Sequence, residues 1–249
     1  MDMGFSDDIL NIVRQLPKQR QTLLFSATMP NKIRDFSKQI LDQPEEIRLA
    51  VSKPAEGIDQ RFYMAFDRQK IYLLEHILKT QDVQSMVLFT SQKAAVGGIV
   101  RAINKLGYEA KGISSDRTQE EREQIMREFK NKQFPILVAT DVLSRGIDID
   151  SLSHVVNYDI PRAAEDYVHR IGRTARAATK GTAITFISDQ DQDRVVKIER
   201  LIEREIEKQN ITEELGLGEA PEFDPKRFSG LRGKIGGRPE RGGRSGGSG

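Results

Sequence analysis

The stretch PILVATDVLSRGIDIDSLSHVVNYD, residues 135–159, contains the pattern that decides the fold. It holds two short apolar runs, PILVAT and HVVNYD, separated by a polar segment with a glycine, an arginine and several acids. Apolar runs of about four to seven residues, bounded by polar and turn-forming residues, are typical of strands that are buried on both faces of a sheet.

The same kind of run recurs along the chain, and a segment of helical period separates each run from the next. The runs of strand length are QRFYMAF (60–66), SMVLFT (85–90), YEAKGI (108–113) and TAITFI (182–187). The segments of helical period are KIYLLEHIL (70–78), AAVGGIVRAINKL (94–106), TQEEREQIMREF (118–129) and a long charged helix from about 190 to 208. Strands that alternate with helices predict a parallel sheet covered on both faces. We therefore expect one complete α/β domain over residues 59–208.

Residues 1–50 predict about two helices and two strands, which supply too little apolar surface to close a core. The predicted strands are TLLFSAT (22–28) and EIRLA (46–50). The clearest predicted helix, residues 31–41, follows Pro30 and places four apolar side chains on one face, which are Ile33, Phe36, Ile40 and Leu41. Two interpretations stay open: a small subdomain packed on the main domain, or the trailing part of a second α/β domain whose front half is missing. We favour the second.

The segment between these parts and the C-terminal tail have the composition of connecting or unfolded chain. Residues 51–58 lack periodicity and contain Pro54 and Gly57, so we predict a linker. Seven basic residues against one acid give residues 226–249 a net charge of +6, which leaves −4 for residues 1–225 of a chain whose total is +2. We predict that residues 209–249 form a disordered basic Gly/Arg-rich tail, which either only solubilises the chain or contacts RNA weakly.

The composition also excludes several classes of protein. The chain has 249 residues, no cysteine and three scattered histidines, so disulfides and thiolate or zinc sites are not expected and a cytoplasmic location is favoured. No apolar run approaches the ~18 residues that a membrane span needs, and the N-terminus lacks the features of a signal peptide. An acidic body with a basic tail instead suggests a polyanionic partner.

The segment YVHRIGRTAR, residues 167–176, places three arginines three residues apart, at Arg170, Arg173 and Arg176. Glycine is unfavourable inside a helix, so Gly172 is expected to end one, with Arg170 in its last turn. Like charges this close repel one another unless an anion lies among them, and guanidinium groups suit phosphate oxygens. By itself such a stripe would more simply be a solvated basic face.

Polar residues also follow two of the predicted strands, where ligands of parallel α/β sheets bind. The strand that ends at Thr140 is followed by two acids, an arginine and a glycine, which are Asp141, Asp148, Arg145 and Gly146. The triplet Ser-Ala-Thr, residues 26–28, follows the apolar run TLLF in the same way. Each of these features is weak alone, because a Thr-Asp pair at a strand end is most often a helix cap.

Together, in this order, the motifs resemble the C-terminal half of a DEAD-box RNA helicase, and most closely the bacterial RhlE-like branch. MDMGF resembles the residues that follow the Asp-Glu-Ala-Asp box, and SAT resembles motif III. VLFTSQK is similar to motif IV, QEER (119–122) to the Gln-x-x-Arg motif, VATDVLSRGIDI to motif V and YVHRIGRTAR to motif VI. The resemblance covers residues 1–190, and it implies that residues 1–50 are the end of a first RecA-like domain and residues 59–208 a second one.

In this family two RecA-like domains hold ATP between them and RNA across them. The resemblance implies that Arg173 and Arg176 face the γ-phosphate, with Arg176 as the arginine finger, and that Asp148 approaches the ribose. It also implies that His169 and Arg170 reach the acidic box and motif III of the first domain.

For RNA, the resemblance implies backbone contacts that do not depend on sequence. The residues concerned are Thr140, Gly146 and Arg122, with Gln119 in support. Coupling between the two domains would involve Ser26, Thr28, Asp141 and Arg145. The implied partners are therefore RNA and an N-terminal RecA-like domain, in cis or in trans, and the chain is expected to be a monomer that does not bind membranes.

The sequence departs from the family pattern at several positions. Gln92 stands where a threonine is usual, Ser114 where a histidine is common, and Ala175 and Ala178 where glycines are usual. The sequence also contains neither a G-x-x-x-x-G-K-[ST] loop nor an Asp-Glu-Ala-Asp box. ATP with Mg²⁺ would therefore be bound mainly by the first domain, and we expect no ATP hydrolysis by this chain alone. The alternative function is a non-catalytic RNA-binding or adaptor module made of a lone RecA-like domain.

Overall fold

A computed structural model describes residues 5–26, 29, 31–47, 57–140, 149, 151–174 and 181–226. The chain divides into two compact units, Met1–Lys53 and Pro54–Gly249. Within the described residues, no helix combines the length and the apolar character that crossing a membrane requires.

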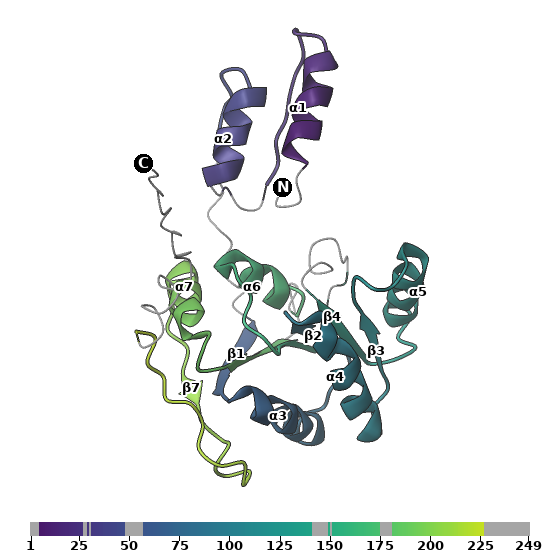
Figure 1. Cartoon of the computed structure of the whole chain (residues 1–249), viewed down its shortest axis with the longest axis vertical. Helices are drawn as coiled ribbons and strands as arrows, with labels where there is room; N and C mark the ends of the chain where they lie inside the picture. The colour runs from purple at the N-terminus through teal and green to yellow at the C-terminus, as the bar shows by residue number, and fades with distance from the viewer. Residues whose placement is uncertain are drawn as a thin grey trace, which may run out of the picture. The chain divides into compact units, whose positions relative to one another are not determined.

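The second unit is built on a seven-stranded parallel sheet with the strand order β3-β4-β2-β5-β6-β1-β7 (Figure 1). The strands are β1 (Ile58–Met64), β2 (Met86–Thr90), β3 (Ala110–Ile113), β4 (Ile136–Thr140), β5 (His154–Asn157), β6 (Gly181–Ile187) and β7 (Lys208–Gln209). The first six coincide with predicted strands. Ile58, which we assigned to the linker, is the first residue of β1 and is buried.

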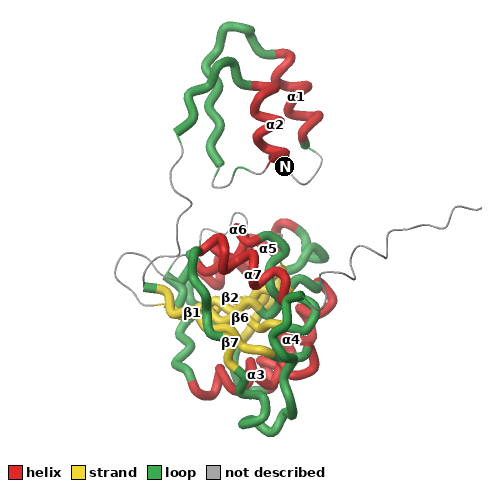
Figure 2. The backbone as a smooth tube through the Cα atoms, turned by 90° about the vertical axis from the view of Figure 1, so that its left-hand side faces the viewer, coloured by secondary structure: helices red, strands yellow, loops and turns green. Residues whose placement is uncertain are grey.

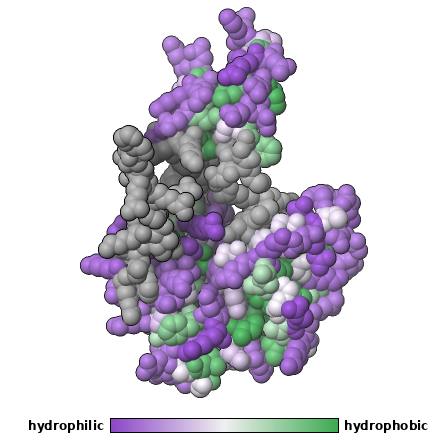
Figure 3. Space-filling view, in the orientation of Figure 1, coloured by the Kyte–Doolittle hydropathy of each residue, from purple (hydrophilic) through white to green (hydrophobic). Residues whose placement is uncertain are grey.

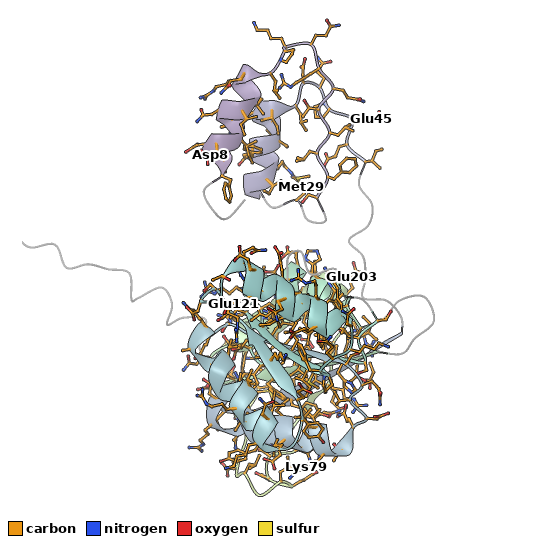
Figure 4. The ribbon with its side chains drawn as sticks, turned by 90° about the vertical axis from the view of Figure 1, so that its right-hand side faces the viewer. Asp8, Met29, Glu45, Lys79, Glu121 and Glu203 are labelled. Atoms are coloured by element: carbon orange, nitrogen blue, oxygen red, sulfur yellow. The ribbon has the colours of Figure 1, made fainter. Side chains whose placement is uncertain are left out.

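Helices cover both faces of the sheet, as predicted (Figure 2). α3 (Asp67–Thr80) and α4 (Lys93–Lys105) pack on one face, and α5 (Gln119–Lys130), α6 (Ala164–Ile171) and α7 (Gln192–Ile202) on the other. Alternating residues of β2 supply both cores: Met86 and Leu88 face α3 and α4, whereas Val87 and Phe89 face the opposite layer. In Figure 4, Lys79 on α3 accordingly lies on the opposite side of the domain from Glu121 on α5.

The two edges of the sheet are short. At one edge, the side chain of Asn104 accepts a hydrogen bond from the Ala110 amide (2.7 Å) and donates to its carbonyl (3.4 Å). In the same edge strand, Arg117 Nε donates to the Gly112 carbonyl at 2.8 Å. At the other edge, β7 pairs with β1 over only two residues. Side chains therefore occupy backbone groups that β3 would otherwise present to solvent.

The predicted charged helix over 190–208 is shorter than expected. α7 ends at Ile202, and Glu203 adopts a left-handed conformation (φ 53°) that turns the chain out of the helix. The chain then runs to Lys208, where β7 begins. The charged sequence has helical composition, but pairing with β1 and burial of Ile206 stabilise an extended backbone here instead.

Residues 203–226, which we call the strap, correct the prediction of a disordered tail from residue 209 onward. Gln69 donates to the carbonyls of Leu217 (3.0 Å) and Glu219 (2.9 Å), and Gln192 donates to that of Glu222 (2.7 Å). Apolar strap residues pack on both cores, namely Ile211, Leu215, Leu217, Ala220 and Phe223. The low hydrophobicity of the strap hides these few anchors from a composition argument. Residues 227–249 lie outside the described part of the chain.

The first unit contains α1 (Ser6–Gln15) and α2 (Asn31–Ile40), which lie side by side (Figure 1). On α2, Phe36 and Ile40 are buried as predicted, whereas Ile33 and Leu41 are only half-buried. Residues 22–26 and 46–47 form no strand, contrary to the prediction, and the remaining residues of those two segments lie outside the described part. A strand needs a neighbour to satisfy its backbone, and within the described residues this unit provides none.

Large apolar side chains remain exposed mainly on the first unit. Of the eight exposed large hydrophobic residues in the described part of the chain, seven lie here: Phe5, Ile12, Leu16, Leu23, Phe25, Met29 and Ile47. Figure 3 shows hydrophobic side chains open to solvent on this unit among hydrophilic ones. Such exposure is unusual for a finished domain and is what the trailing part of a larger one would show.

Removal of residues 1–53 should leave the second unit folded and make the protein less hydrophobic on its surface. We expect the shortened chain to keep a cooperative thermal transition and to enhance the fluorescence of 8-anilinonaphthalene-1-sulfonate less than the full chain does. Loss of the cooperative transition would show instead that the second unit depends on the first.

Truncation at two positions should separate the strap from the residues that follow it. Deleting residues 210–249 removes the strap anchors and should lower the free energy of unfolding by more than about 2 kcal/mol, measured by urea denaturation. Deleting only residues 227–249 should change it by less than about 0.5 kcal/mol. Equal effects of the two truncations would contradict a stabilising role for the strap.

Candidate functional site

The carboxyl ends of the central strands form the edge at which we predicted the site. Thr90 ends β2 and Thr140 ends β4, and the two threonines are paired in register and buried. α5 follows the carboxyl end of β3, so Gln119 and Arg122 in its first turn lie at the same edge. Lys93 at the start of α4 forms an ion pair with Asp116, which joins the first residue of α4 to the segment that precedes α5. Parallel α/β sheets bind their ligands at this edge.

The arginine segment begins as predicted. α6 starts after Ala163 and ends at Ile171, and Gly172 caps it, with its amide donating to the Val168 carbonyl at 2.9 Å. Arg173 follows directly and is half-buried, and its carbonyl accepts a hydrogen bond from the Leu152 amide at 3.0 Å. His169 is also half-buried, in the last turn of the helix.

Arg170 lies in the last turn of α6, as predicted, and its side chain is buried. Its side chain is 1% exposed, and its Nη1 donates to Asn157 Oδ1 (2.8 Å) and to the Asp159 carbonyl (3.1 Å). The guanidinium carbon also lies 4.8 Å from the centre of the Phe89 ring. Arg170 therefore holds α6 against the sheet, and the contact with the first domain that the resemblance implies stays a prediction.

A second buried charge, Lys70 on α3, reaches the same point from the opposite face of the sheet. Lys70 Nζ lies 2.8 Å from Asp159 Oδ1 and 2.8 Å from Asp67 Oδ1. The other oxygen of Asp159, Oδ2, accepts hydrogen bonds from Thr90 Oγ1 (2.7 Å), the Ser91 amide (2.9 Å) and Ser91 Oγ (3.2 Å). The Asp159 carboxylate is thus satisfied on both oxygens, as a buried charge must be.

The environment of this pair shifts the pKa of each partner. Burial disfavours the ammonium of Lys70, but the Asp159 carboxylate outweighs burial and raises the pKa of Lys70. Burial also disfavours the Asp159 carboxylate, yet Lys70, Thr90 and Ser91 together hold the pKa of Asp159 below its usual value. Burial, followed by the nearby Asp159 charge, raises the pKa of the Tyr158 phenol. Both members of the ion pair are therefore charged at neutral pH.

The residues predicted to contact RNA are described only in part. Gln119 is exposed and donates to Glu123 Oε1 (2.9 Å), and Arg122 is half-buried with its Nε 3.4 Å from the Thr118 carbonyl. Thr118 begins α5 with a reciprocal cap, in which its Oγ1 accepts from the Glu121 amide and its amide donates to Glu121 Oε2. This cap fixes the turn of helix that presents Gln119 and Arg122.

Several predicted site residues lie outside the described part of the chain. They are Thr28, Asp141, Arg145, Gly146, Asp148 and Arg176. Ser26 is described and is exposed in the first unit. The roles that we assigned to these residues therefore stay predictions.

Sequence reasoning missed three residues of the buried network, Lys70, Asn157 and Asp159. Lys70 had a signal that could have revealed it, because it falls on the same helical stripe as the buried residues Leu73, Leu74 and Ile77. A lysine in an apolar stripe must either reach water or meet an acid. No local signal identified Asp159 as that acid, since it lies 89 residues away along the chain.

Replacing Lys70 with methionine should destabilise the domain in a way that depends on pH. The Lys70→Met variant keeps the volume but leaves the Asp159 carboxylate buried without its main cation, so the free energy of unfolding should fall by about 3–5 kcal/mol at pH 7. Because the folded-state pKa of Asp159 is depressed in the wild type, the stabilisation is present above its unfolded pKa of about 4 and is lost as the pH falls through the folded value. Urea denaturation should show the gap between variant and wild type narrowing below about pH 4, and a constant gap would contradict this origin.

Comparison with protein families agrees with this arrangement. The model of the helicase conserved C-terminal domain matches residues 69–178, and the DEAD/DEAH box helicase model matches residues 1–36. The ATP-dependent RNA helicase CshA of Listeria monocytogenes is 44% identical over 192 residues, which are 77% of this chain and 37% of the relative. CshA of Limosilactobacillus reuteri is 41% identical over 202 residues, which are 81% of this chain and 41% of the relative. The chain thus spans about two fifths of the length of these relatives.

Solved structures give the same result. Saccharomyces cerevisiae Dbp5 bound to RNA and ADP BeF3 superimposes with a TM-score of 0.73 at 28% identity, covering 86% of this chain and 57% of that chain. The Escherichia coli DEAD-box protein SrmB, bound to regulator of ribonuclease activity A, superimposes with a TM-score of 0.58 at 33% identity, covering 66% of this chain and 96% of that chain.

The comparisons correct one detail of the predicted resemblance and confirm its main part. The curated relatives reported above are CshA helicases, so the predicted RhlE-like branch is not supported. The RecA-like fold of the second unit and the short N-terminal remnant of a first domain are confirmed. On this evidence the chain belongs to the DEAD-box family of RNA helicases, of which it carries chiefly the helicase C-terminal domain.

Proposed function

We propose that the chain supplies the second RecA-like half of an ATP-dependent RNA helicase. In this role Arg173 and Arg176 face the γ-phosphate of ATP that is held by a first RecA-like domain, and Asp148 approaches the ribose. The observation that carries the proposal is the end of α6, where the buried Arg170 fixes the helix and Arg173 follows its capping glycine. An arginine finger must be held in place before the reaction, because its contribution depends on preorganised charge.

The same edge of the sheet supplies half of the proposed RNA groove. Thr140, Arg122 and Gln119 lie at the carboxyl ends of the strands, and α4 and α5 both begin there. Helix N-termini and side-chain donors favour phosphate groups, which makes backbone contact independent of base sequence. The likeness to Dbp5, whose structure contains RNA and ADP BeF3, supports RNA and a nucleotide as the ligands of the assembled site.

ATP with Mg²⁺ is the proposed cofactor, and when bound it supplies the phosphoryl group whose hydrolysis drives strand separation. This chain contributes cationic side chains at the phosphate, and its sequence contains no P-loop. The proposed partner is therefore an N-terminal RecA-like domain, in the same polypeptide or in another one, and the chain alone should not hydrolyse ATP.

The proposal is tested by measuring RNA-stimulated ATP turnover by this chain alone and after mixing it with a separately produced N-terminal domain of a CshA helicase. We expect no turnover by either part and measurable turnover by the mixture. Arg176→Ala should reduce the recovered rate by about 10³-fold or more, as expected for an arginine finger. Arg200→Ala, which removes an exposed arginine from α7, is the matched control and should leave the rate unchanged.

Two other outcomes would contradict the proposal. Turnover by the chain alone would place the nucleotide site somewhere else. A mixture that stays inactive while the chain still binds RNA after deletion of residues 227–249 would favour the lone RNA-binding or adaptor module.

A further inference from the structure

Gly181, the first residue of β6, is in close contact with the arginine segment, residues 167–176. A Cβ atom added to Gly181 would lie less than 3.0 Å from three atoms of Thr174, which are its Cβ, its Oγ1 (2.6 Å) and its carbonyl carbon (2.7 Å). Atoms in a close-packed interior do not approach one another this closely, so only a glycine fits here without a shift of one of the two segments. The contact lies on the face of the sheet that α6 and α7 cover, where Ala183, two residues further along β6, is also buried.

The start of β6 has no room to move away from Thr174. β6 lies between β5 and β1 in the sheet. The Gly181 amide donates to the Gly57 carbonyl at 3.3 Å, and the next amide, that of Thr182, donates to the Ser153 carbonyl at 3.0 Å. Because neighbours on both sides fix this end of the strand, a methyl group added at Gly181 would displace Thr174 and not β6.

Thr174 in turn fixes the backbone of Arg173. Thr174 is fully buried, and its amide and hydroxyl both donate to the Ile171 carbonyl, at 3.0 Å and 2.9 Å. The Arg173 carbonyl, in the peptide group that joins the two residues, accepts from the Leu152 amide at 3.0 Å. The Cβ and the carbonyl carbon of Thr174 cannot swing aside by rotation of the side chain, so a displacement of Thr174 also moves the Arg173 peptide group.

We propose that Gly181 is a positioning residue for Arg173, because the missing side chain at the start of β6 lets Thr174 take the place that directs Arg173 toward the γ-phosphate. This role rests on the proposed function, since it assumes a nucleotide phosphate opposite Arg173. Arg176 lies outside the described part of the chain, and the proposed contact acts on Arg173. Preorganised charge stabilises a transition state only when its position is held before the reaction.

The test compares Gly181→Ala with Gly112→Ala in the full chain. Gly112 is also a buried strand glycine, and an added Cβ would lie 2.6 Å from Val96 Cγ1 and 3.1 Å from Val100 Cγ2. Both of these contacts are with side-chain methyl groups, and three strands separate β3 from β6. Gly112→Ala therefore reports the effect of crowding in the sheet without a displacement of Thr174.

RNA-stimulated ATP turnover is measured with the full chain and a saturating concentration of the N-terminal domain of a CshA helicase, at a temperature where circular dichroism shows each variant folded. We expect Gly181→Ala to lower kcat by about ten-fold or more, because a misplacement of about 1 Å can cost about 10²-fold in rate. The KM for ATP should change by less than about two-fold, since in the proposed function the first domain holds most of the nucleotide.

Gly112→Ala should keep both kcat and KM within about two-fold of the wild type. A wild-type kcat in Gly181→Ala, or an equal fall of kcat in the two variants, would overturn the proposal.

If Gly181→Ala does not fold, Thr174→Ala tests the same contact by removing atoms from it. This substitution deletes the hydroxyl that donates to the Ile171 carbonyl. It should lower kcat by about three-fold or more and leave the KM for ATP within about two-fold of the wild type. A wild-type kcat in this variant would overturn the positioning role.

The failure of this proposal is distinguishable from the failure of the proposed function. No turnover by the wild-type mixture would contradict the proposed function. The positioning role is then tested on the chain alone, by NMR-detected exchange of the Leu152 amide proton, which is bonded to the Arg173 carbonyl. Exchange should be faster in Gly181→Ala than in Gly112→Ala, because a displaced carbonyl protects the amide less. Equal exchange in the two variants would show that Gly181 does not position Arg173.

Discussion

Lys70 and Asp159 form an ion pair inside the second unit, where both side chains are buried. The elements around this ion pair are held together through it. Lys70 comes from the helix layer on one face of the sheet and binds the Asp159 carboxylate, two residues after the end of β5. Arg170 comes from the layer on the other face and binds Asn157 Oδ1 and the Asp159 carbonyl. Replacing a buried ion pair by apolar residues is often neutral for stability, whereas removing one partner is costly. The pair is therefore better understood as a constraint on register than as a source of stability. These bonds join α3, the end of β2, the segment after β5 and α6 to one another.

The sequence predicted secondary structure best for strands that are buried on both faces of the sheet. β2 and β4 were predictable because each has four consecutive apolar residues before a threonine, and α6 because Gly172 marks its end. The strap and β7 were not predictable, since their anchors are a few apolar residues and two distant glutamines within a polar, glycine-containing sequence. Arg170 was placed correctly at the end of the helix, but its hydrogen-bond partners in the sheet were not predicted. The residues that bind it, Asn157 and Asp159, are neighbours of α6 only in the folded sheet.

The two units differ in how completely they bury their apolar side chains. The second unit covers both faces of its sheet and leaves only Tyr72 among its large hydrophobic residues exposed within the described part of the chain. The first unit buries Phe36 and Ile40 but exposes residues of its helices and of the segments predicted as strands. The prediction of strands failed in this unit because its apolar residues have a strand pattern but no neighbouring strand to pair with. The same sequence pattern requires neighbouring strands before it can determine a backbone conformation.

The short strand β7 has a consequence for how the molecule meets other chains. An open sheet offers its outermost backbone groups to any extended segment, and a long bare edge invites the edge-to-edge joining that leads to aggregation. Here the outermost strand on one side is two residues long and is preceded by the exposed acids Glu205 and Glu207, while Asn104 and Arg117 occupy backbone groups on the other side. A second polypeptide would find little backbone to pair with at either margin. Association through this domain is therefore expected to use its side-chain surfaces and not extension of the sheet. Contacts through side chains can be regulated by charge and by ligands.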